Sequence, residues 1–408
     1  MGAPAARASE LARHWTDGGH EVTILTGFPN HPTGAVHPDY RRKLRRLVTR
    51  ERLGKIDVVR TWLLPFPNGK SYERILNYSS FCASAAITGL FLSRPDALIA
   101  TSPQLLVALA GWWLSRVKHV PFIFEVRDLW PESLTAVGVG NPGSLLHKTL
   151  GHIAGFLYRN SDHIVVVTSS FRDFLVENWG VTPSKISIVE NGVETDLFRP
   201  RDGQQIKSEL GAQDKFVVSY IGTMGMAHGL ETLIDAAVEL QRTSSNVLFL
   251  LVGEGSEKKR LMNVAHSRGL NNLRFLDQQP RDKVPDYISA SDACLVYLKK
   301  ADVFKTVIPT KMLEFMSCAR PVILGVDGLA HDILENAQAG TYVEPENVAA
   351  LTEAVTSLAS SPTQCTTLGL NGRKHILAHF SRKMTAQKYI SVLERVLGKP
   401  QKGISAAA

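Results

Sequence analysis

The sequence predicts two α/β domains, each built on a doubly wound parallel sheet with helices on both faces. Three observations point to this class. The chain has 408 residues, more than one hydrophobic core usually holds. Short apolar runs alternate with helical patterns along its whole length. These runs are almost continuously apolar, as expected of parallel strands that are buried on both faces.

Twelve strands are expected, six in each half of the chain. Each is an apolar run of four to seven residues, bounded by turn residues or by the start of a helical pattern. The predicted strands cover residues 21–25, 56–62, 97–101, 122–126, 163–168, 186–190, 216–222, 247–253, 273–276, 293–298, 321–325 and 341–344.

The polar, turn-rich stretch "NGVETDLFRPRDGQQ" marks the break between the domains. We expect an N-terminal domain over residues 1–196 and a C-terminal domain over 197–379. A last helix is expected over 380–398, with a flexible tail over 399–408.

The first helical pattern raises a question about the start of the sheet. Its apolar stripe consists of Ala5, Ala8, Leu11, Ala12 and Trp15, and the pattern stops at a Gly-Gly pair. A domain of this class normally opens with a strand before this helix, and only four residues precede the stripe here. We therefore expect the first strand to be missing from this chain and the natural protein to begin upstream.

The charge distribution predicts an anionic partner. The net charge is +8, and the segment from Arg41 to Lys55 holds eight basic residues and one acidic one. No aromatic residues interleave with these arginines, and no helix-turn-helix or zinc-finger spacing appears, so nucleic acid is not the expected partner. An anionic membrane surface fits better.

Two uncharged stretches, residues 75–93 and 97–115, follow the basic segment. Each is about long enough to cross a bilayer, but polar residues interrupt both. They can form a buried helix followed by strand, loop and helix. Alternatively, the segment from Ile75 to Leu92 lies in the membrane interface and exposes residues such as Phe81, Leu90, Phe91 and Leu92. A buried or interfacial position is favoured over a spanning one.

Several function classes are not supported. The four cysteines form no CxxC pair, so neither a disulfide framework nor a zinc site is indicated, and no signal-peptide pattern is present. A reducing cytoplasm is the simplest compartment. The chain has no DxD sequence, so no metal and no cofactor are expected.

Two glycine-rich turns follow strands of the C-terminal domain. "YIGTMGMAHGLETL" places Gly222, Gly225 and Gly229 between a strand and a helix. In "LVGEGSEKKRL", Gly253 has the same position after a strand and before a helix. Glycine there lets the backbone approach a ligand closely, and a helix N-terminus favours phosphate. Neither loop matches a Walker or dinucleotide-binding pattern.

The stretch "IPTKMLEF" adds a cation and a carboxylate to this domain. Pro309 can occupy the first turn of a helix that begins near Ile308 to Thr310, and Lys311 and Glu314 then share one face. Lys311 and the exposed amides suit a diphosphate, and Glu314 can accept hydrogen bonds from ribose hydroxyls. A surface ion pair on a core helix is the alternative. The neighbouring glycine loops favour a nucleotide diphosphate.

These motifs, in this order, resemble the retaining GT-B glycosyltransferases of family four over nearly the whole chain. "ENGVETDLF", both glycine loops, "RFLDQQPRDKVPDYISASDACLVYL" and "PTKMLEFMSCARPVI" carry the resemblance. It implies that the last helix crosses back to the N-terminal domain. "FPNHPTG", "EVRDLWPES" and "IPTKMLEF" are most similar to the WbuB-like branch. That branch transfers N-acetylated deoxy sugars in O-antigen or capsule assembly.

Four positions depart from the broad family. Thr306 stands where that family has a second glutamate, and Thr223 and His228 stand where it has phosphate-binding Arg and Lys. The broad family also has a histidine near the sugar, and within "EVRDLW" of this chain Arg127 or Asp128 stands at that position. The resemblance implies that these are features of the branch.

The resemblance implies roles for the remaining site residues. Phosphate stabilisation falls to Lys311, the amides flanking Pro309, and Arg127 and His228, while Asp128 orients the sugar or Arg127. Asn30 and His31 are acceptor-side candidates. The donor-binding set is Gly222, Thr223, His228, Gly253, Glu254, Leu276, Ile308, Pro309, Thr310, Lys311 and Glu314.

The expected reaction moves a sugar from a nucleotide-diphosphate donor, a UDP-sugar in the first instance, to a polyprenyl-diphosphate-linked saccharide. The enzyme would then attach peripherally to the inner face of the cytoplasmic membrane. Two alternatives stay open: a nucleotide-sugar epimerase of the same fold, and a catalytically inert nucleotide-sugar-binding subunit.

Overall fold

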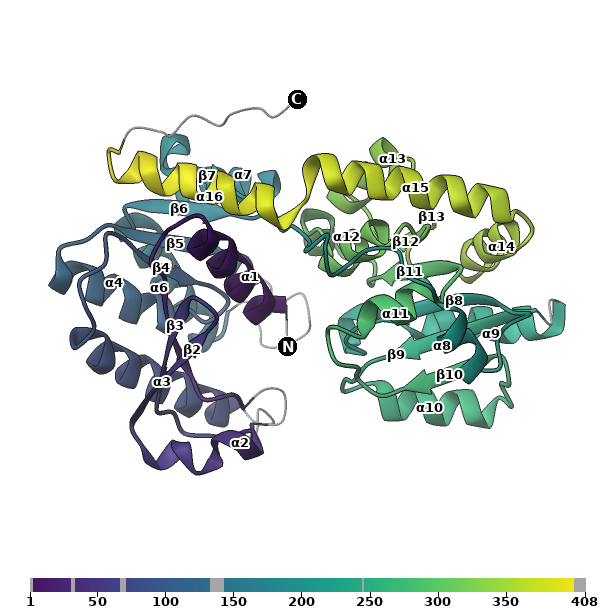
Figure 1. Ribbon diagram of the computed structural model, residues 1–408, viewed down its shortest axis with the longest axis horizontal. Coiled ribbons are helices and arrows are strands. Elements are labelled where there is room, and N and C mark those ends of the chain that lie inside the picture. Colours follow the sequence, from purple (N-terminus) through teal and green to yellow (C-terminus); the bar gives the residue numbers. More distant parts are fainter. Residues whose placement is uncertain (1–2, 31–33, 67–70, 133–142, 244–245, 400–408) are drawn as a thin grey trace. The chain divides into compact units, whose positions relative to one another are not determined.

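The computed structural model describes residues 3–30, 34–66, 71–132, 143–243 and 246–399 (Figure 1). Packing divides the chain into two compact units. The N-terminal unit comprises Ala8–Glu190 and Thr385–Ala408, and the C-terminal unit comprises Asn191–Met384 and Met1–Arg7. The chain changes unit after Glu190 and again after Met384, a few residues from the sequence-based boundaries at 196 and 379.

The C-terminal unit contains a six-stranded sheet in the order β10-β9-β8-β11-β12-β13, with every neighbouring pair parallel. The strand order reverses between β8 and β11, the point at which ligands bind in doubly wound folds. Its elements are α8 (Gln204–Glu209), β8 (Phe216–Ile221), η3 (Met226–His228), α9 (Glu231–Thr243), β9 (Val247–Val252), α10 (Lys258–Ser267), β10 (Leu273–Leu276), α11 (Val284–Ser289), β11 (Ala293–Tyr297), η4 (Asp302–Thr306), α12 (Thr310–Ser317), β12 (Val322–Gly325), α13 (Leu329–Ala337), β13 (Gly340–Tyr342), α14 (Val348–Ala359) and α15 (Pro362–His379).

Two apolar clusters cover the two faces of this sheet. Met312, Phe315 and Met316 of α12 pack in one cluster, and Leu233 of α9 and Leu351 of α14 pack in the other. Full burial of each such side chain contributes about 1.5–3 kcal/mol. Because α12 is anchored through these residues, the polar side chains at its first turns have a defined position.

The N-terminal unit holds two separate sheets instead of one. The orders are β1-β3-β2 and β4-β5-β6-β7, and no strand precedes α1 among the described residues. The elements are α1 (Ala3–Asp17), β1 (Thr23–Gly27), α2 (Pro38–Arg41), η1 (Lys43–Arg45), β2 (Val48–Leu53), β3 (Ile56–Thr61), α3 (Ser71–Leu90), β4 (Leu98–Thr101), α4 (Leu105–Lys118), β5 (Phe122–Val126), α6 (Leu145–Asn160), β6 (His163–Val166), α7 (Ser169–Trp179), η2 (Pro183–Lys185), β7 (Ile186–Ile188) and α16 (Arg382–Val396).

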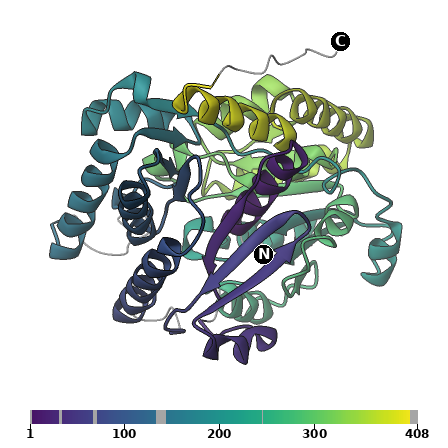
Figure 2. The same ribbon diagram turned by 60° about the vertical axis from the view of Figure 1, so that its left-hand side comes forward.

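The strand β2 corrects the expectation of purely parallel sheets. It forms an antiparallel hairpin with β3 (Figure 2). The turn of this hairpin contains Gly54, whose φ is +60°. The turn is too short for a parallel crossover, so the two strands must run in opposite directions. The strand β2 lies within the basic segment, and its arginines leave no apolar run by which the sequence would indicate a strand.

The last helix, α16, packs in the N-terminal unit. Ala386, Tyr389 and Val392 join a core cluster with Ile123 of β5 and Val165 of β6. The Tyr389 ring meets the ring of Trp15 edge-on at 5.2 Å. The contacts of this helix are therefore those of a core element.

Candidate active site

The helix α12 begins where the six-stranded sheet reverses its strand order. Pro309 is its N-cap residue, one position before the first turn in which the sequence places it, and Thr310 is the first helical residue. The backbone N–H of Met312 donates to the Pro309 carbonyl at 3.0 Å. The first amides of a helix have no acceptor within the helix, and the helix dipole makes this end favourable for an anion.

Lys311 turns towards β8 instead of towards Glu314. Its Nζ donates a hydrogen bond to the Tyr220 hydroxyl at 2.8 Å and lies 3.9 Å from the centroid of the Tyr220 ring. The Tyr220 hydroxyl donates in turn to the Thr223 carbonyl at 2.6 Å. A Cβ atom on Gly222 would lie 2.9 Å from this Nζ, so the ammonium group is directly against the first glycine loop.

The surroundings of Lys311 lower its pKa to about 7. Burial is the main cause, and the nearby Glu314 carboxylate partly opposes it. Within the described part of the chain, no carboxylate forms an ion pair with Lys311. Such a lysine gains its charge easily when an anion arrives.

This pKa predicts a pH-dependent affinity for a nucleotide sugar, whose diphosphate does not titrate near neutrality. Below pH 7 Lys311 is already charged, and above pH 7 binding must take up a proton. The dissociation constant should therefore rise between pH 7 and 9, by up to about tenfold per pH unit. Calorimetry in two buffers of different ionisation enthalpy measures the uptake. A dissociation constant that is flat over this range, in wild type as in Lys311→Met, would exclude this role.

Glu314 has a different partner, Arg281 from the loop between β10 and α11. The Arg281 Nη1 atom donates to Glu314 Oε1 at 3.1 Å, and the two side chains are 23% and 12% exposed. The guanidinium also lies 5.0 Å from the centroid of the Phe198 ring. Lys311 and Glu314 thus share a helix face but contact different residues.

The two glycine loops pack directly on each other. Met224 N donates to the Glu254 carbonyl at 2.8 Å, and Glu257 N donates to the Met224 carbonyl at 3.0 Å. Gly253 has φ +147°, and a Cβ there would lie 2.0 Å from the Gly222 carbonyl oxygen. The glycine signal in the sequence therefore corresponds to a close backbone contact.

His228 ends the short helix η3 within the first glycine loop. Its Nδ1 atom lies 3.3 Å from the backbone of Gly225, and its ring packs edge-on against Tyr220. Burial, and secondarily Lys311, lower its pKa to about 3. At neutral pH His228 can offer a hydrogen bond but not a positive charge. Thr223 is exposed beside it.

The second glycine loop is tied to the end of β10 by Lys258. This buried ammonium group contacts the carboxylates of Glu254 and Asp277, each at 2.6 Å, and donates to the Leu276 carbonyl at 3.2 Å. The predicted donor-binding residues Glu254 and Leu276 are therefore held together by a residue that the sequence did not single out.

Ile308, the last residue before the N-cap, packs partly buried on the core cluster beside α12. Thr306 ends η4, and its hydroxyl donates to the Val303 carbonyl at 2.7 Å. Thr306, which stands where the broad family has a second glutamate, thus makes a local contact with the backbone.

Arg127 and Asp128 follow β5 in the N-terminal unit. The backbone N–H groups of both residues donate to Ser102 Oγ, at 2.8 and 3.2 Å. The Arg127 guanidinium donates to the Ser102 carbonyl at 3.0 Å through Nη2 and lies 3.8 Å from Glu125 Oε2. Burial raises the pKa of Asp128, and Arg127 opposes the shift. Both residues are thus held by Ser102 at the carboxyl ends of β4 and β5.

The acceptor-side candidates are only partly described. Asn30 follows β1, and its carbonyl accepts a hydrogen bond from Gly34 N at 2.6 Å. His31 lies outside the described residues. Among the residues that are described, no group of three or more His, Cys, Asp or Glu side chains is placed to hold a metal ion.

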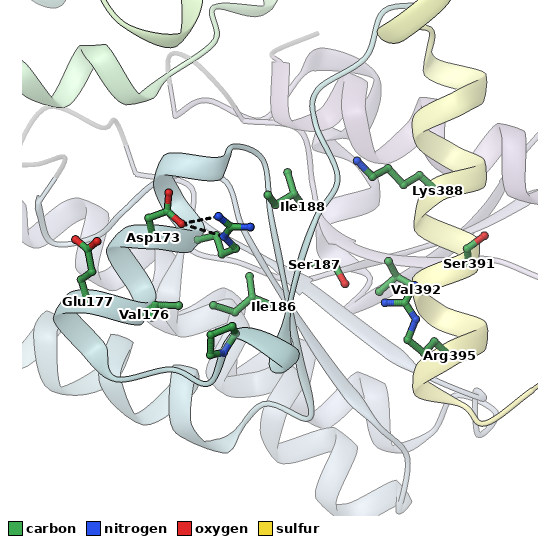
Figure 3. Close-up of a pocket in the computed structure, with 12 residues that line it drawn as sticks. Asp173, Val176, Glu177, Ile186, Ser187, Ile188, Lys388, Ser391, Val392 and Arg395 are labelled. Carbon is green, nitrogen blue, oxygen red and sulfur yellow. Dashed lines mark hydrogen bonds and ion pairs between the residues drawn. The ribbon is translucent and has the colours of Figure 1, made fainter.

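A cavity of about 580 Å³ lies elsewhere in the N-terminal unit, along β7. Lys388, Ser391 and Arg395 of α16 line one side, and Asp173 and Glu177 of α7 line the other (Figure 3). None of the predicted site residues borders it.

The structure thus brings most of the predicted donor-binding residues to one edge of one sheet. Tyr220, Arg281 and Lys258 complete the cluster. Their partners are between 3 and 91 positions away along the chain, so no local spacing predicts most of these contacts. One feature of the sequence could have pointed to Tyr220: it is a polar aromatic residue near the end of a strand, directly before a glycine loop.

Comparisons with known families match both units. Residues 2–192 match the family described as "Glycosyl transferase 4-like domain". Residues 202–375 match "Glycosyl transferases group 1". A relative in Escherichia coli strain K12, "Putative colanic acid biosynthesis glycosyl transferase WcaI", is 25% identical over 345 residues. The alignment covers 82% of this chain and 83% of the relative.

Solved structures show the same two-domain fold. Sucrose-phosphate synthase from Thermosynechococcus elongatus superposes with a TM-score of 0.75 at 19% identity, over 98% of this chain and 94% of that one. Anabaena HepE in complex with UDP-glucose superposes with a TM-score of 0.68 at 16% identity, over 92% of this chain and 100% of that one.

Proposed function

The chain is a glycosyltransferase of the GT-B fold, a glycosyl transferase 4-like domain followed by a glycosyl transferases group 1 domain, and we propose that it transfers a sugar from a UDP-sugar to a lipid-linked glycan. The observation that carries the donor assignment is the position of Lys311. Its ammonium lies beside Gly222 at the amino end of α12, where the sheet reverses its strand order. The complex of HepE with UDP-glucose supports a nucleotide-sugar donor.

The proposed chemistry needs stabilisation of a departing diphosphate more than it needs a protein nucleophile. As the bond from the sugar to the diphosphate breaks, negative charge grows on the leaving oxygen. Lys311, the first amides of α12 and a hydrogen bond from His228 are available for that charge. Glu314 would accept hydrogen bonds from the ribose. The acceptor hydroxyl would attack the anomeric carbon on the face that the diphosphate leaves and pass its proton to the departing phosphate oxygen, so that the configuration is retained.

The sugar and the product class are the finer part of the proposal. The motifs "FPNHPTG", "EVRDLWPES" and "IPTKMLEF" are similar to the WbuB-like branch, which favours an N-acetylated deoxy sugar. The name of the E. coli relative, which refers to colanic acid biosynthesis, supports a role in a cell-surface polysaccharide.

The acceptor proposal rests on two exposed features of the N-terminal unit. Arg42, Arg45, Arg46 and Arg50 are exposed and have no acidic partner among the described residues. The helix α3 exposes an apolar stripe at helical spacing, namely Tyr72, Ile75, Leu76, Ile87 and Leu90, with Phe91 just beyond at 80% exposure.

No described helix is long and apolar enough to cross a membrane. Phe81 and Leu92, which the sequence places among the exposed residues, are both partly buried, and Phe81 lies against Gly27. We propose that α3 lies in the interface of the inner leaflet of the cytoplasmic membrane, while the arginines bind anionic headgroups. A polyprenyl diphosphate presents the same chemistry, a lipid with an anionic head.

The membrane proposal predicts that serine at Arg41, Arg42, Arg45 and Arg46 reduces partitioning onto anionic vesicles by tenfold or more. Each basic residue near such a surface contributes about 1 kcal/mol. Vesicle co-sedimentation measures the effect. The matched control replaces four exposed basic residues of the C-terminal unit, Arg242, Lys259, Lys283 and Lys374, and removes the same charge. Equal partitioning of the two variants would end the assignment.

One assay separates the proposed function from its two alternatives. Purified protein is incubated with UDP-sugars, with and without a polyprenyl-diphosphate-linked saccharide. Release of UDP that depends on the acceptor identifies a transferase. Interconversion of the sugar without acceptor identifies an epimerase, and binding without any product identifies an inert subunit.

A further inference from the structure

The ion pair between Arg281 and Glu314 is a feature of the donor site that the sequence did not predict. Two cations lie near Glu314: Lys311 on the same helix, and Arg281 from another loop. The carboxylate bonds to Arg281 at 3.1 Å, while Lys311 donates to Tyr220 at 2.8 Å. The glutamate is therefore held in place without using the lysine.

Arg281 is itself held by the core of the unit. Its guanidinium lies 5.0 Å from the centroid of the Phe198 ring, and that ring is 1% exposed. The Phe198 carbonyl accepts a hydrogen bond from Ser317 Oγ of α12 at 2.5 Å. Arg281 thus links Glu314 to a fixed aromatic ring that is bound to the same helix.

We propose that Arg281 is a positioning residue that orients the Glu314 carboxylate towards the ribose diol of the donor, and so sets selectivity for ribonucleotides over 2′-deoxyribonucleotides. The inference rests on the proposed function, since it assumes a nucleotide donor at α12. It adds a residue that acts through another and a measurable specificity.

The physical reason is the geometry of the pair. A glutamate side chain has several rotamers, and fixing one costs conformational entropy each time a ligand binds. A charge-assisted hydrogen bond from a planar guanidinium fixes the carboxylate before the ligand arrives. A vicinal diol then meets a carboxylate already in place, whereas a 2′-deoxyribose has one hydroxyl fewer to offer.

Four proteins test this inference: wild type, Arg281→Gln, Arg281→Lys and the control Arg201→Gln. The control removes a comparable half-buried ion pair of the same unit, between Arg201 and Asp286 at 2.9 Å. The dissociation constants of UDP and 2′-deoxy-UDP are measured by calorimetry, and thermal unfolding is followed in parallel.

Wild type should prefer UDP over 2′-deoxy-UDP by about tenfold or more, as expected of a hydrogen bond to a charged group. Arg281→Gln should weaken UDP binding about tenfold and 2′-deoxy-UDP binding less than threefold, so that the preference collapses. Arg281→Lys, which keeps a charge but loses the planar fork, should lie in between. Arg201→Gln should keep the preference even if it lowers thermal stability.

Two results would overturn the inference. One is a wild-type preference that persists in Arg281→Gln. The other is an equal loss of affinity for both nucleotides, which is what a purely structural role produces. If Arg281→Gln does not fold, the same two criteria apply to Arg281→Lys. Failure of the nucleotide-donor assignment looks different, because wild type would then bind neither nucleotide, and failure of the transferase assignment appears only in the acceptor-dependent assay above.

Discussion

Lys311→Ala is expected to lower kcat/KM by about 10²–10³-fold, the usual cost of removing one electrostatic contact to a developing charge. The reason is local. At the amino end of α12, this ammonium is the group directly against Gly222, and His228 is neutral at pH 7 because its pKa is about 3. Without Lys311, the first amides of the helix and the helix dipole would carry most of the stabilisation of the leaving diphosphate.

Steady-state kinetics with a UDP-sugar measures this effect, and Lys207→Ala is the matched control. Lys207 is a lysine of the same unit with a 13% exposed side chain, and it pairs with Asp292 at 2.8 Å. Its loss should lower thermal stability but leave kcat/KM within about threefold of wild type. Equal kinetics for the two variants would show that α12 is not the donor site.

Gly253→Ala is expected to destabilise the C-terminal unit by about 3 kcal/mol or more and to abolish donor binding. The new Cβ would lie 2.0 Å from the Gly222 carbonyl oxygen, and the backbone has φ +147°, which side chains rarely allow. Either the two glycine loops separate or β9 shifts, and both changes displace the loop against which Lys311 lies. For a unit of this size, such a loss lowers the melting temperature by about 6–12 °C.

Thermal unfolding checks this expectation, with Gly269→Ala as the control. Gly269 also has a positive φ, +64°, but no atom lies within 4 Å of its added Cβ. It should cost only about 1–2 kcal/mol, the price of the left-handed conformation alone. A Gly253→Ala protein as stable as Gly269→Ala, with UDP affinity intact, would mean that the two loops need no close approach.

Most of the fold could be predicted, because a parallel strand that is buried on both faces is a continuous apolar run in the sequence. All twelve predicted strands are present, and β5 and β10 have the predicted bounds. The strand β2 was missed for a physical reason. It is an exposed edge strand in which arginines alternate with an acidic residue, so no apolar run marks it. Only its antiparallel pairing with β3 makes it a strand.

The candidate site was predictable in its backbone and less so in its side-chain partners. Glycines after strands indicate close approaches, and Gly222 and Gly253 make one. Spacing on α12 placed Lys311 and Glu314 on one face, with an ion pair between them as the alternative to a nucleotide site. Their actual partners, Tyr220 and Arg281, come from other elements, and only the order of strands in the sheet brings them together.

A crystal structure of the protein with bound UDP tests the central claim most directly. The claim predicts diphosphate oxygens about 2.7–3.2 Å from Lys311 Nζ and from the first amides of α12, with the ribose hydroxyls on Glu314. A UDP molecule bound elsewhere, with Lys311 still donating to the Tyr220 hydroxyl, would contradict it.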